Sequence, residues 1–233
     1  MNFDRIAPYF RPLEWLLFQD SMQRARECHL SKVRDARSIL VLGEGDGRFV
    51  EALLRASSPR GRHIEILDSS RRMLGLAKKR LQRSGIDPKA IAGIRWRPED
   101  LRGADLGQQR FDLVVTPFVL DCFSAESLEK IVPSIASSLQ PGGHWLHIDF
   151  REAKTPRWAR WRSRAWLFAL YAFFRRTVDL EARELHDLEP LMRGYSLKRQ
   201  SNTRFRGGLI EASLWESFTP GQASGKITQG ETT

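Results

Sequence analysis

A turn rich in glycine constrains the fold of this 233-residue chain more than any other feature. The stretch ILVLGEGDGRFVEALL, residues 39–54, begins with four apolar residues and ends with apolar residues at helical spacing. Its three glycines, Gly43, Gly45 and Gly47, are separated by single charged residues. Glycine permits a tight turn and lets a backbone or a ligand approach without a β carbon in the way. The stretch predicts a strand, a turn and a helix, with a bound molecule against the turn.

Predicted strands alternate with predicted helices along the rest of the chain. Strands are expected at 63–67, 94–98, 111–115 and 144–150, and two closing strands within 195–201 and 208–215. Helices are expected at 12–28, at 69–84 and at 124–140, the last with Ser124 as N-cap, a kink at Pro133 and a stop at 141–143. Such alternation predicts an α/β fold in which helices cover both faces of a parallel sheet.

A single domain is expected to account for residues 1–216, followed by a disordered polar tail at 217–233. Within the domain, the part at 30–150 contains the glycine turn, and a helical insertion is expected at 151–193. The insertion concentrates tryptophan, phenylalanine and tyrosine near the end of the fifth strand. Most of these aromatic side chains must be core, but their number favours an apolar or aromatic ligand there.

Composition excludes several classes of protein. The hydrophobic content of 41% is typical of a folded globular protein. Two cysteines without metal-ligand spacing predict neither disulfides nor a metal site, as in a reducing cytoplasm. The N-terminus has no apolar segment of signal-peptide length, and the longest nearly apolar run, 165–174, is too short to span a membrane. We therefore predict a cytoplasmic protein without a resident metal.

Positive charge is concentrated in the C-terminal third. The chain has a net charge of +10, and residues 151–206 hold fourteen Lys and Arg against six Asp and Glu, a net +8. A solvated basic face is the simplest interpretation. Phosphate contacts with RNA and weak association with an anionic membrane are the alternatives.

Acidic residues follow the second and third predicted strands. Asp68 lies 21 positions after Gly47, where a carboxylate can accept hydrogen bonds from ribose hydroxyls. Asp100 follows the third strand and could reach an adenine amino group. The dinucleotide pattern G-x-G-x-x-G is not met, because Arg48 stands at its last position. A nucleoside-containing ligand is implied, although Asp68 could also cap the next helix.

In their order along the chain, these motifs resemble those of the class I S-adenosylmethionine-dependent methyltransferases. VLGEGDGRF is similar to their first motif, LDSSRRML to the acidic motif of the second strand, and RPEDL to the adenine-contacting loop. FDLVVTPFVLDCF and LQPGGHWLHIDF are similar to the motifs around the fourth and fifth strands. FDRIAPYF, at 3–10, further resembles the subfamily that methylates quinone precursors. The resemblance implies a Rossmann-like, seven-stranded, mostly parallel sheet and S-adenosylmethionine as the cofactor.

The resemblance also implies site residues at the carboxyl ends of the strands. The cofactor-binding residues would be Gly43, Glu44, Gly45, Gly47, Asp68, Ser69, Met73, Asp100, Leu101 and Thr116. The acceptor would contact Tyr9, Pro117, Phe118 and Trp158. Asp121 and Asp149 are candidate general bases, with a cap or loop role as an equal alternative.

One position departs from the family pattern. The family usually has an acid two positions before the first glycine, where this chain has Val41, so Glu44 or another group is expected to replace it. The free amides at the helix start, near Arg48 and Phe49, are expected to favour the cofactor's carboxylate. His144 and His147 lie at odd spacing on one strand and are expected to be structural.

The expected reaction is methyl transfer to a small, largely apolar or aromatic acceptor, for example a quinone-like phenol housed partly by 151–193. Two alternatives remain. One is an RNA methyltransferase that uses the basic C-terminal third, although no separate RNA-binding module is visible. The other is a non-catalytic module that binds S-adenosylmethionine, which the departure at Val41 keeps open. The residue patterns leave the methylated atom and the oligomeric state undecided.

Overall fold

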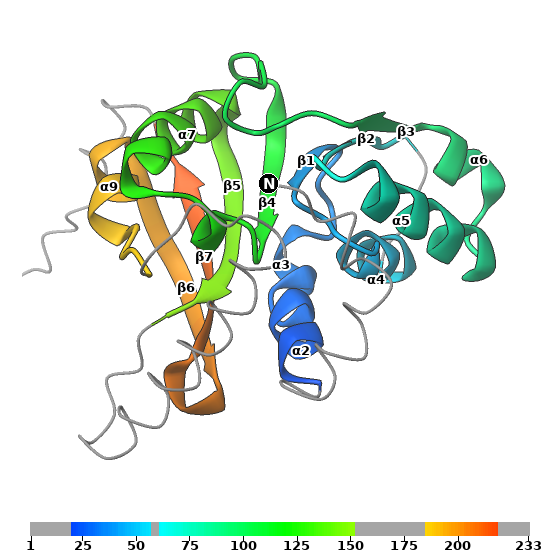
Figure 1. Cartoon of the computed structure of the whole chain (residues 1–233), viewed down its shortest axis with the longest axis horizontal. Coiled ribbons are helices and arrows are strands. Elements are labelled where there is room, and N and C mark those ends of the chain that lie inside the picture. The colour runs from blue at the N-terminus through cyan, green and yellow to red at the C-terminus, as the bar shows by residue number, and fades with distance from the viewer. Residues whose placement is uncertain (1–19, 57–60, 152–184, 219–233) are drawn as a thin grey trace, which may run out of the picture.

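One seven-stranded sheet organises the computed structural model, which describes residues 20–56, 61–151 and 185–218. The strands are β1 (Ser38–Leu42), β2 (His63–Leu67), β3 (Ile94–Arg97), β4 (Phe111–Pro117), β5 (Leu139–Phe150), β6 (Leu197–Phe205) and β7 (Ile210–Ser217). Their order is β3-β2-β1-β4-β5-β7-β6 (Figure 1). The first five strands run parallel, and β7 lies antiparallel between β5 and β6. The predicted Rossmann-like, mostly parallel sheet is confirmed.

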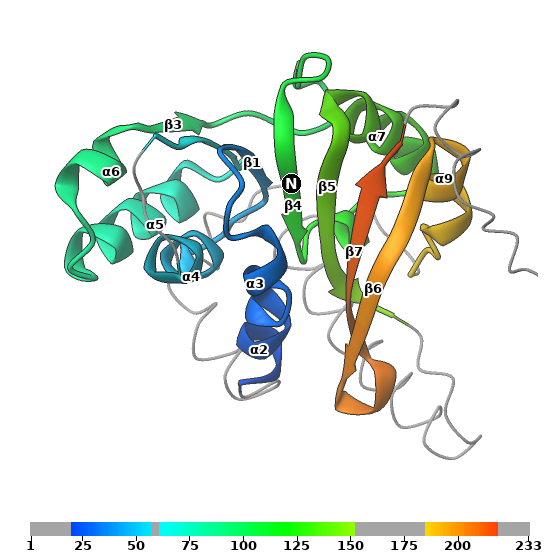
Figure 2. The ribbon, with the colours of Figure 1, turned by 180° about the vertical axis from the view of Figure 1, so that it is seen from behind.

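Helices cover both faces of this sheet, as the alternation predicted (Figures 1 and 2). One face packs against α2 (Ser21–Glu27), α3 (Leu30–Val33), α4 (Arg48–Ala56) and α5 (Arg71–Arg83). The other face packs against the 3-10 helix η2 (Leu120–Cys122), α7 (Ala125–Ser138) and α9 (Glu189–Gly194). The short α6 (Pro88–Ala92) precedes β3, and the 3-10 helix η3 (Arg206–Gly208) joins β6 to β7.

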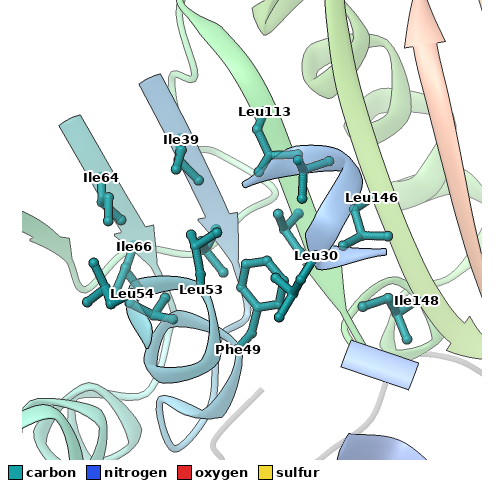
Figure 3. Close-up of a cluster of buried hydrophobic side chains, with 14 of the residues drawn as sticks. Leu30, Ile39, Phe49, Leu53, Leu54, Ile64, Ile66, Leu113, Leu146 and Ile148 are labelled. Atoms are coloured by element: carbon teal, nitrogen blue, oxygen red, sulfur yellow. The ribbon is translucent and has the colours of Figure 1, made fainter. Parts of the chain in front are cut away.

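The first of these faces explains why residues 48–56 form a helix after the glycine turn. Phe49 and Leu53 of α4 point into a cluster with Ile39 of β1 and Leu30 of α3 (Figure 3). All four are at most 7% exposed. Val41, at the position where the family usually has an acid, is completely buried in the same cluster. It is therefore a core residue and cannot be replaced by a charge without loss of packing.

The end of α7 differs from the prediction. The helix includes Pro133 but ends at Ser138, and residues 139–143 already belong to β5. The expected stop therefore lies inside a strand. Leu139 pairs with Phe111, and a β carbon at Gly143 would lie 3.1 Å from the Phe111 carbonyl oxygen. This close approach to β4 draws the segment into the sheet.

Cations line both edges of the sheet. At the β3 edge, Arg95 and Arg97 approach Glu65 of β2, whose side chain is completely buried. Although burial of Glu65 acts in the opposite direction, a hydrogen bond with His63 and the charge of nearby arginines hold its pKa below the usual range. At the other edge, β6 exposes Lys198 and Arg204. The ends of the sheet therefore present mostly basic side chains.

Several predictions concern residues outside the described ranges. They are Tyr9, Trp158, the part of the first helix at 12–19, most of the insertion at 151–193 and most of the tail at 217–233. In the part of the insertion that is described, α9 is helical, as expected. Among the described helices, none is long and apolar enough to cross a membrane.

Candidate active site

The carboxyl ends of the parallel strands meet at one edge of the sheet. The amide of Gly43, after β1, donates to the carbonyl of Leu67 at the end of β2, at 2.8 Å. The amide of Phe118, after β4, donates to the carbonyl of Ile148 in β5, at 2.7 Å. In open α/β sheets, ligands bind in the crevice outside these ends. The sequence-predicted site residues in the described ranges lie along this edge.

The three glycines of the turn serve different purposes. All three have positive φ, which favours glycine. A β carbon at Gly43 would lie 2.4 Å from a methyl of Val119, and one at Gly47 would lie 2.8 Å from the α carbon of Ala77 in α5. A β carbon at Gly45 would meet nothing within 4 Å. Packing alone thus requires glycine at 43 and 47, and only Gly45 leaves open space that a ligand can enter.

Asp68 holds the turn against the end of β2. Its Oδ2 accepts a hydrogen bond from the amide of Gly45 at 3.1 Å, and its Oδ1 accepts one from Ser70 at 2.8 Å. Ser70, rather than the exposed Ser69, is the N-cap of α5 and accepts from the amide of Met73. Since each carboxylate oxygen can accept more than one hydrogen bond, Asp68 supports the loop and can still receive a ribose hydroxyl.

Glu44 folds back onto the start of α4. Its Oε1 accepts from the amide of Val50 at 3.1 Å, and the amide of Phe49 also acts on the carboxylate. Its Oε2 is buried and accepts no hydrogen bond from any described residue. Burial raises the pKa of Glu44 to about 8. Two amides of the helix start are therefore engaged by the chain's own carboxylate, which leaves fewer of them for the cofactor than the sequence predicts.

The predicted adenine-side residues are in place only in part. Leu101 and Met73 are both buried, and the burial of Met73 is compatible with either a core or a ligand-facing role. Asp100 accepts hydrogen bonds from the amide and the guanidinium of Arg102, and the bond with Arg102 holds its pKa below the usual range. The carboxylate of Asp100 is thus already engaged within its own loop.

The cofactor role predicted for the side chain of Thr116 is not supported. Thr116 is completely buried, and its hydroxyl accepts from the indole of Trp145 at 3.0 Å. The same hydroxyl bonds Nδ1 of His147 at 3.1 Å. Burial lowers the pKa of His147 to about 4, so this histidine is a neutral structural group, as the sequence predicted. Thr116 belongs to the core network beneath the site.

Two acids, the buried Asp149 and the half-buried Asp121, lie near the ends of β5 and β4. Asp149 is 5% exposed; its Oδ2 accepts from the amide of Asp121 at 3.0 Å, and its Oδ1 accepts from Phe150 at 2.9 Å. Burial and then the negative charge of Asp121 raise the pKa of Asp149 well above its usual range. Burial and the charges of Asp121, Asp149 and Asp68 also raise the pKa of the Cys122 thiol. The charges of Asp121, Asp149 and Asp68 therefore all act on the same group, the Cys122 thiol.

Two aromatic rings pack together at the ends of β4 and β5. Phe118 has a φ of +59°, and its ring centroid is 5.3 Å from that of Phe150. The guanidinium carbon of Arg26, a buried residue of α2, lies 5.1 Å from the centroid of Phe118. The neighbouring Pro117 is buried. Sequence reasoning missed Arg26 and Phe150, because nothing distinguishes Arg26 from the other arginines of its helix.

No group of three or more His, Cys, Asp or Glu in the described part of the chain could hold a metal.

Comparisons with known proteins agree with this arrangement. The family described as "Methyltransferase domain" matches residues 39–143. No curated protein matches the sequence. Among solved structures, the mitomycin 7-O-methyltransferase MmcR has a TM-score of 0.66 and 16% identity over 93% of this chain and 61% of its own.

Two bacterial N-methyltransferases have similar folds. NodS of Bradyrhizobium japonicum, in complex with S-adenosyl-L-homocysteine, has a TM-score of 0.59 and 17% identity over 87% of this chain and 91% of its own. The 1,6-didemethyltoxoflavin-N1-methyltransferase of Burkholderia thailandensis has a TM-score of 0.61 and 17% identity over 92% of this chain and 85% of its own.

Residues 39–143 therefore match a methyltransferase domain, and the whole sheet has the fold of solved S-adenosylmethionine-dependent methyltransferases. S-adenosylmethionine is accordingly its cofactor, and the residues of this structure fit it. Gly45 offers open space, Glu44 has a buried oxygen without a partner, and Asp68 stands at the end of β2.

The different purposes of Gly45 and Gly47 can be separated by experiment. Gly45→Ala should cost only about 1–2 kcal/mol of stability, because its β carbon has room and only the left-handed backbone is strained. It should nevertheless weaken the binding of S-adenosylhomocysteine at least tenfold. Gly47→Ala should cost more stability, about 3 kcal/mol, since the backbone of α5 blocks its β carbon. Urea unfolding and calorimetric titration measure the two effects, and equal stability losses would contradict this assignment.

Proposed function

We propose that the protein transfers the methyl group of S-adenosylmethionine to a hydroxyl or an acidic carbon of a small, largely apolar or aromatic acceptor. The observation that carries this proposal is the buried Asp149 at the end of β5, whose oxygens are held by two amide hydrogen bonds. The rings of Phe118 and Phe150 pack together at the ends of β4 and β5. Aromatic walls with a few polar groups are typical of small-molecule sites. A quinone-like phenol is the acceptor that this combination favours, in keeping with the resemblance of residues 3–10.

The chain's own residues would bind the cofactor along the carboxyl edge of the sheet. Asp68 would receive the ribose hydroxyls, Gly45 would let the ligand lie against the turn, and Leu101 with Met73 would border the adenine. S-adenosylmethionine, when bound, supplies a methyl group that is already activated on a sulfonium. The protein therefore contributes mainly alignment, which can account for a large part of the rate enhancement.

Asp149 would act on the acceptor. A general base helps when the nucleophile is a poorly ionised hydroxyl or a carbon acid, and it works best when its pKa is near the operating pH. Because burial and Asp121 raise the pKa of Asp149, this carboxylate is a stronger base than an exposed aspartate. Two amide hydrogen bonds hold its oxygens in place. The rings of Phe118 and Phe150, at the ends of the same strands, would offer an apolar wall to an aromatic acceptor.

The names of the similar structures support a small acceptor without identifying it. One methylates an oxygen of mitomycin, and another methylates N1 of 1,6-didemethyltoxoflavin. RNA remains an alternative because of the net +8 at 151–206, but most of that segment lies outside the described residues. The non-catalytic alternative loses its main support if Glu44 replaces the missing acid at Val41.

Methyl transfer to a small molecule can be tested directly. Incubation with methyl-labelled S-adenosylmethionine and a cell extract should place the label in the organic-soluble, low-molecular-weight fraction. The Asp149→Asn variant is the control, and it should lose this label. Label in the RNA fraction, together with RNA binding that falls steeply with salt, would overturn the proposal. Absence of label from every fraction would favour the non-catalytic module. A separate experiment, sedimentation with anionic vesicles across the same salt series, tests membrane association.

A further inference from the structure

We propose, building on the function above, that Glu44 replaces the acid that is absent at position 41: its Oε2 binds the ammonium group of the cofactor's methionine part, and cofactor binding releases a proton from this carboxyl group. The neutral carboxyl loses its proton to solvent, and the resulting carboxylate pairs with the ammonium of the cofactor.

The position of Glu44 is the first observation that supports this. The residue lies between Gly43, which packs against Val119, and Gly45, which borders open space. Its Oε1 is fixed by the amide of Val50 at 3.1 Å, so the remaining oxygen has a defined place. That oxygen is buried and accepts no hydrogen bond from the described part of the chain. Buried carboxylate oxygens are normally paired, and an unpaired one in a ligand loop indicates a partner supplied by the ligand.

The charged groups around Glu44 do not fully compensate for the burial of its carboxyl group. Arg26 of α2 and Asp46 of the turn are the charged groups that act on it, together with the amides of Val50 and Phe49 from α4. Arg26 lies over the ring of Phe118 and does not fully offset the burial of Glu44. The pKa of Glu44 is therefore raised to about 8, so that in most molecules this carboxyl group is protonated at neutral pH. An arriving ammonium group supplies the missing positive charge.

Neighbouring positions cannot do the same. Val41 is buried in the apolar cluster under α4 and has no polar side-chain atom. Asp68 is engaged with the amides of Gly45 and Ser70 and stands at the ribose side. Asp46 pairs with Arg80 at 2.7 Å and with Arg48 at 3.2 Å. Glu44 differs from both because one of its oxygens is buried and accepts no hydrogen bond from the described residues.

Calorimetric titration with S-adenosylhomocysteine tests this inference, because that molecule keeps the ammonium group but lacks the sulfonium charge. Titrations between pH 6 and 7, in buffers of different ionisation enthalpy, count the protons released, and the α-amino group stays protonated in this range. The wild-type protein should release about 0.9 proton at pH 7, given a pKa of about 8. Its affinity should rise nearly tenfold per pH unit. Release of no proton would overturn the inference.

Two matched variants show which residue releases the proton when the ligand binds. Glu44→Gln keeps an oxygen for the Val50 amide, so it should fold, release no proton and bind at least tenfold more weakly at pH 7. Glu51→Gln, which removes a carboxylate of α4 that pairs with Arg55 and Arg80, should behave like the wild type. Proton release by Glu44→Gln equal to that of the wild type would overturn the inference while the proposed function stands. Failure of the wild-type protein to bind S-adenosylhomocysteine would overturn both.

Discussion

Replacement of Asp149 by asparagine should lower the rate of methyl transfer by about 10²–10⁴-fold, the usual contribution of a general base. The amide cannot take a proton from the acceptor, although it can still accept one of the two amide hydrogen bonds that hold Asp149. Affinity for S-adenosylhomocysteine should change little, since Asp149 is placed on the acceptor side. Single-turnover rates and calorimetric titration separate the two quantities.

The pH dependence distinguishes a base from a structural group. Burial and the charge of Asp121 raise the pKa of Asp149, so the active carboxylate is lost on the acid side and the wild-type rate should rise with pH. Asp121→Asn removes the negative charge, lowers that pKa and should shift the rising limb of the profile to lower pH. Asp149→Asn should abolish the rise. A variant at 149 that keeps the wild-type rate and profile would show that Asp149 is only a cap.

Replacement of Asp68 by alanine should weaken the binding of S-adenosylhomocysteine by about 100-fold. Each hydrogen bond to a charged group contributes about 1.5–3 kcal/mol, equal to roughly a tenfold to a hundredfold change in affinity. The substitution removes the acceptor for the ribose and leaves the amides of Gly45 and Ser70 without their partner. Calorimetric titration gives the affinity, and an unchanged value would contradict the assignment of Asp68 to the cofactor site.

A matched control separates cofactor binding from loss of a local cap. Asp87, the N-cap of α6, accepts from the amide of Lys89 at 2.9 Å, in a helix that precedes β3. Asp87→Ala should cost about 1 kcal/mol of stability, as lost caps do, without altering affinity. Asp68→Asn keeps one oxygen and should fall between the wild type and Asp68→Ala.

Much of the fold could be predicted because the relevant signals are local. The strand expected at 39–42 is found at Ser38–Leu42, and the one expected at 63–67 is found at His63–Leu67, since apolar runs bounded by polar residues mark buried strands. The boundary between α7 and β5 could not be predicted in this way. The pairing of Leu139 with Phe111 is a contact between distant segments, and it overrides the local turn signal at 141–143.

The candidate site was predicted less completely. Asp68 and Gly45 follow from the rule that ligands bind at the carboxyl ends of parallel strands, and the structure joins them by a hydrogen bond. The side chain of Thr116 lies in the core, and its position indicates this, because it shares a strand face with Val114, a core residue. The approach of Arg26 to Phe118 and the unpaired oxygen of Glu44 depend on packing between distant segments. No pattern in the sequence marks either one.

The basic edges of the sheet have a consequence for how copies of this protein meet. An exposed edge strand offers free backbone groups to which a second chain can add a strand, and charged side chains oppose such addition. β3 has only four residues, and Arg95 stands on it, while Lys198 and Arg204 stand exposed on β6. Two molecules approaching edge to edge would bring like charges together. We therefore expect part of the positive excess to act as protection against sheet extension, so that any oligomer of this enzyme forms through its helical faces.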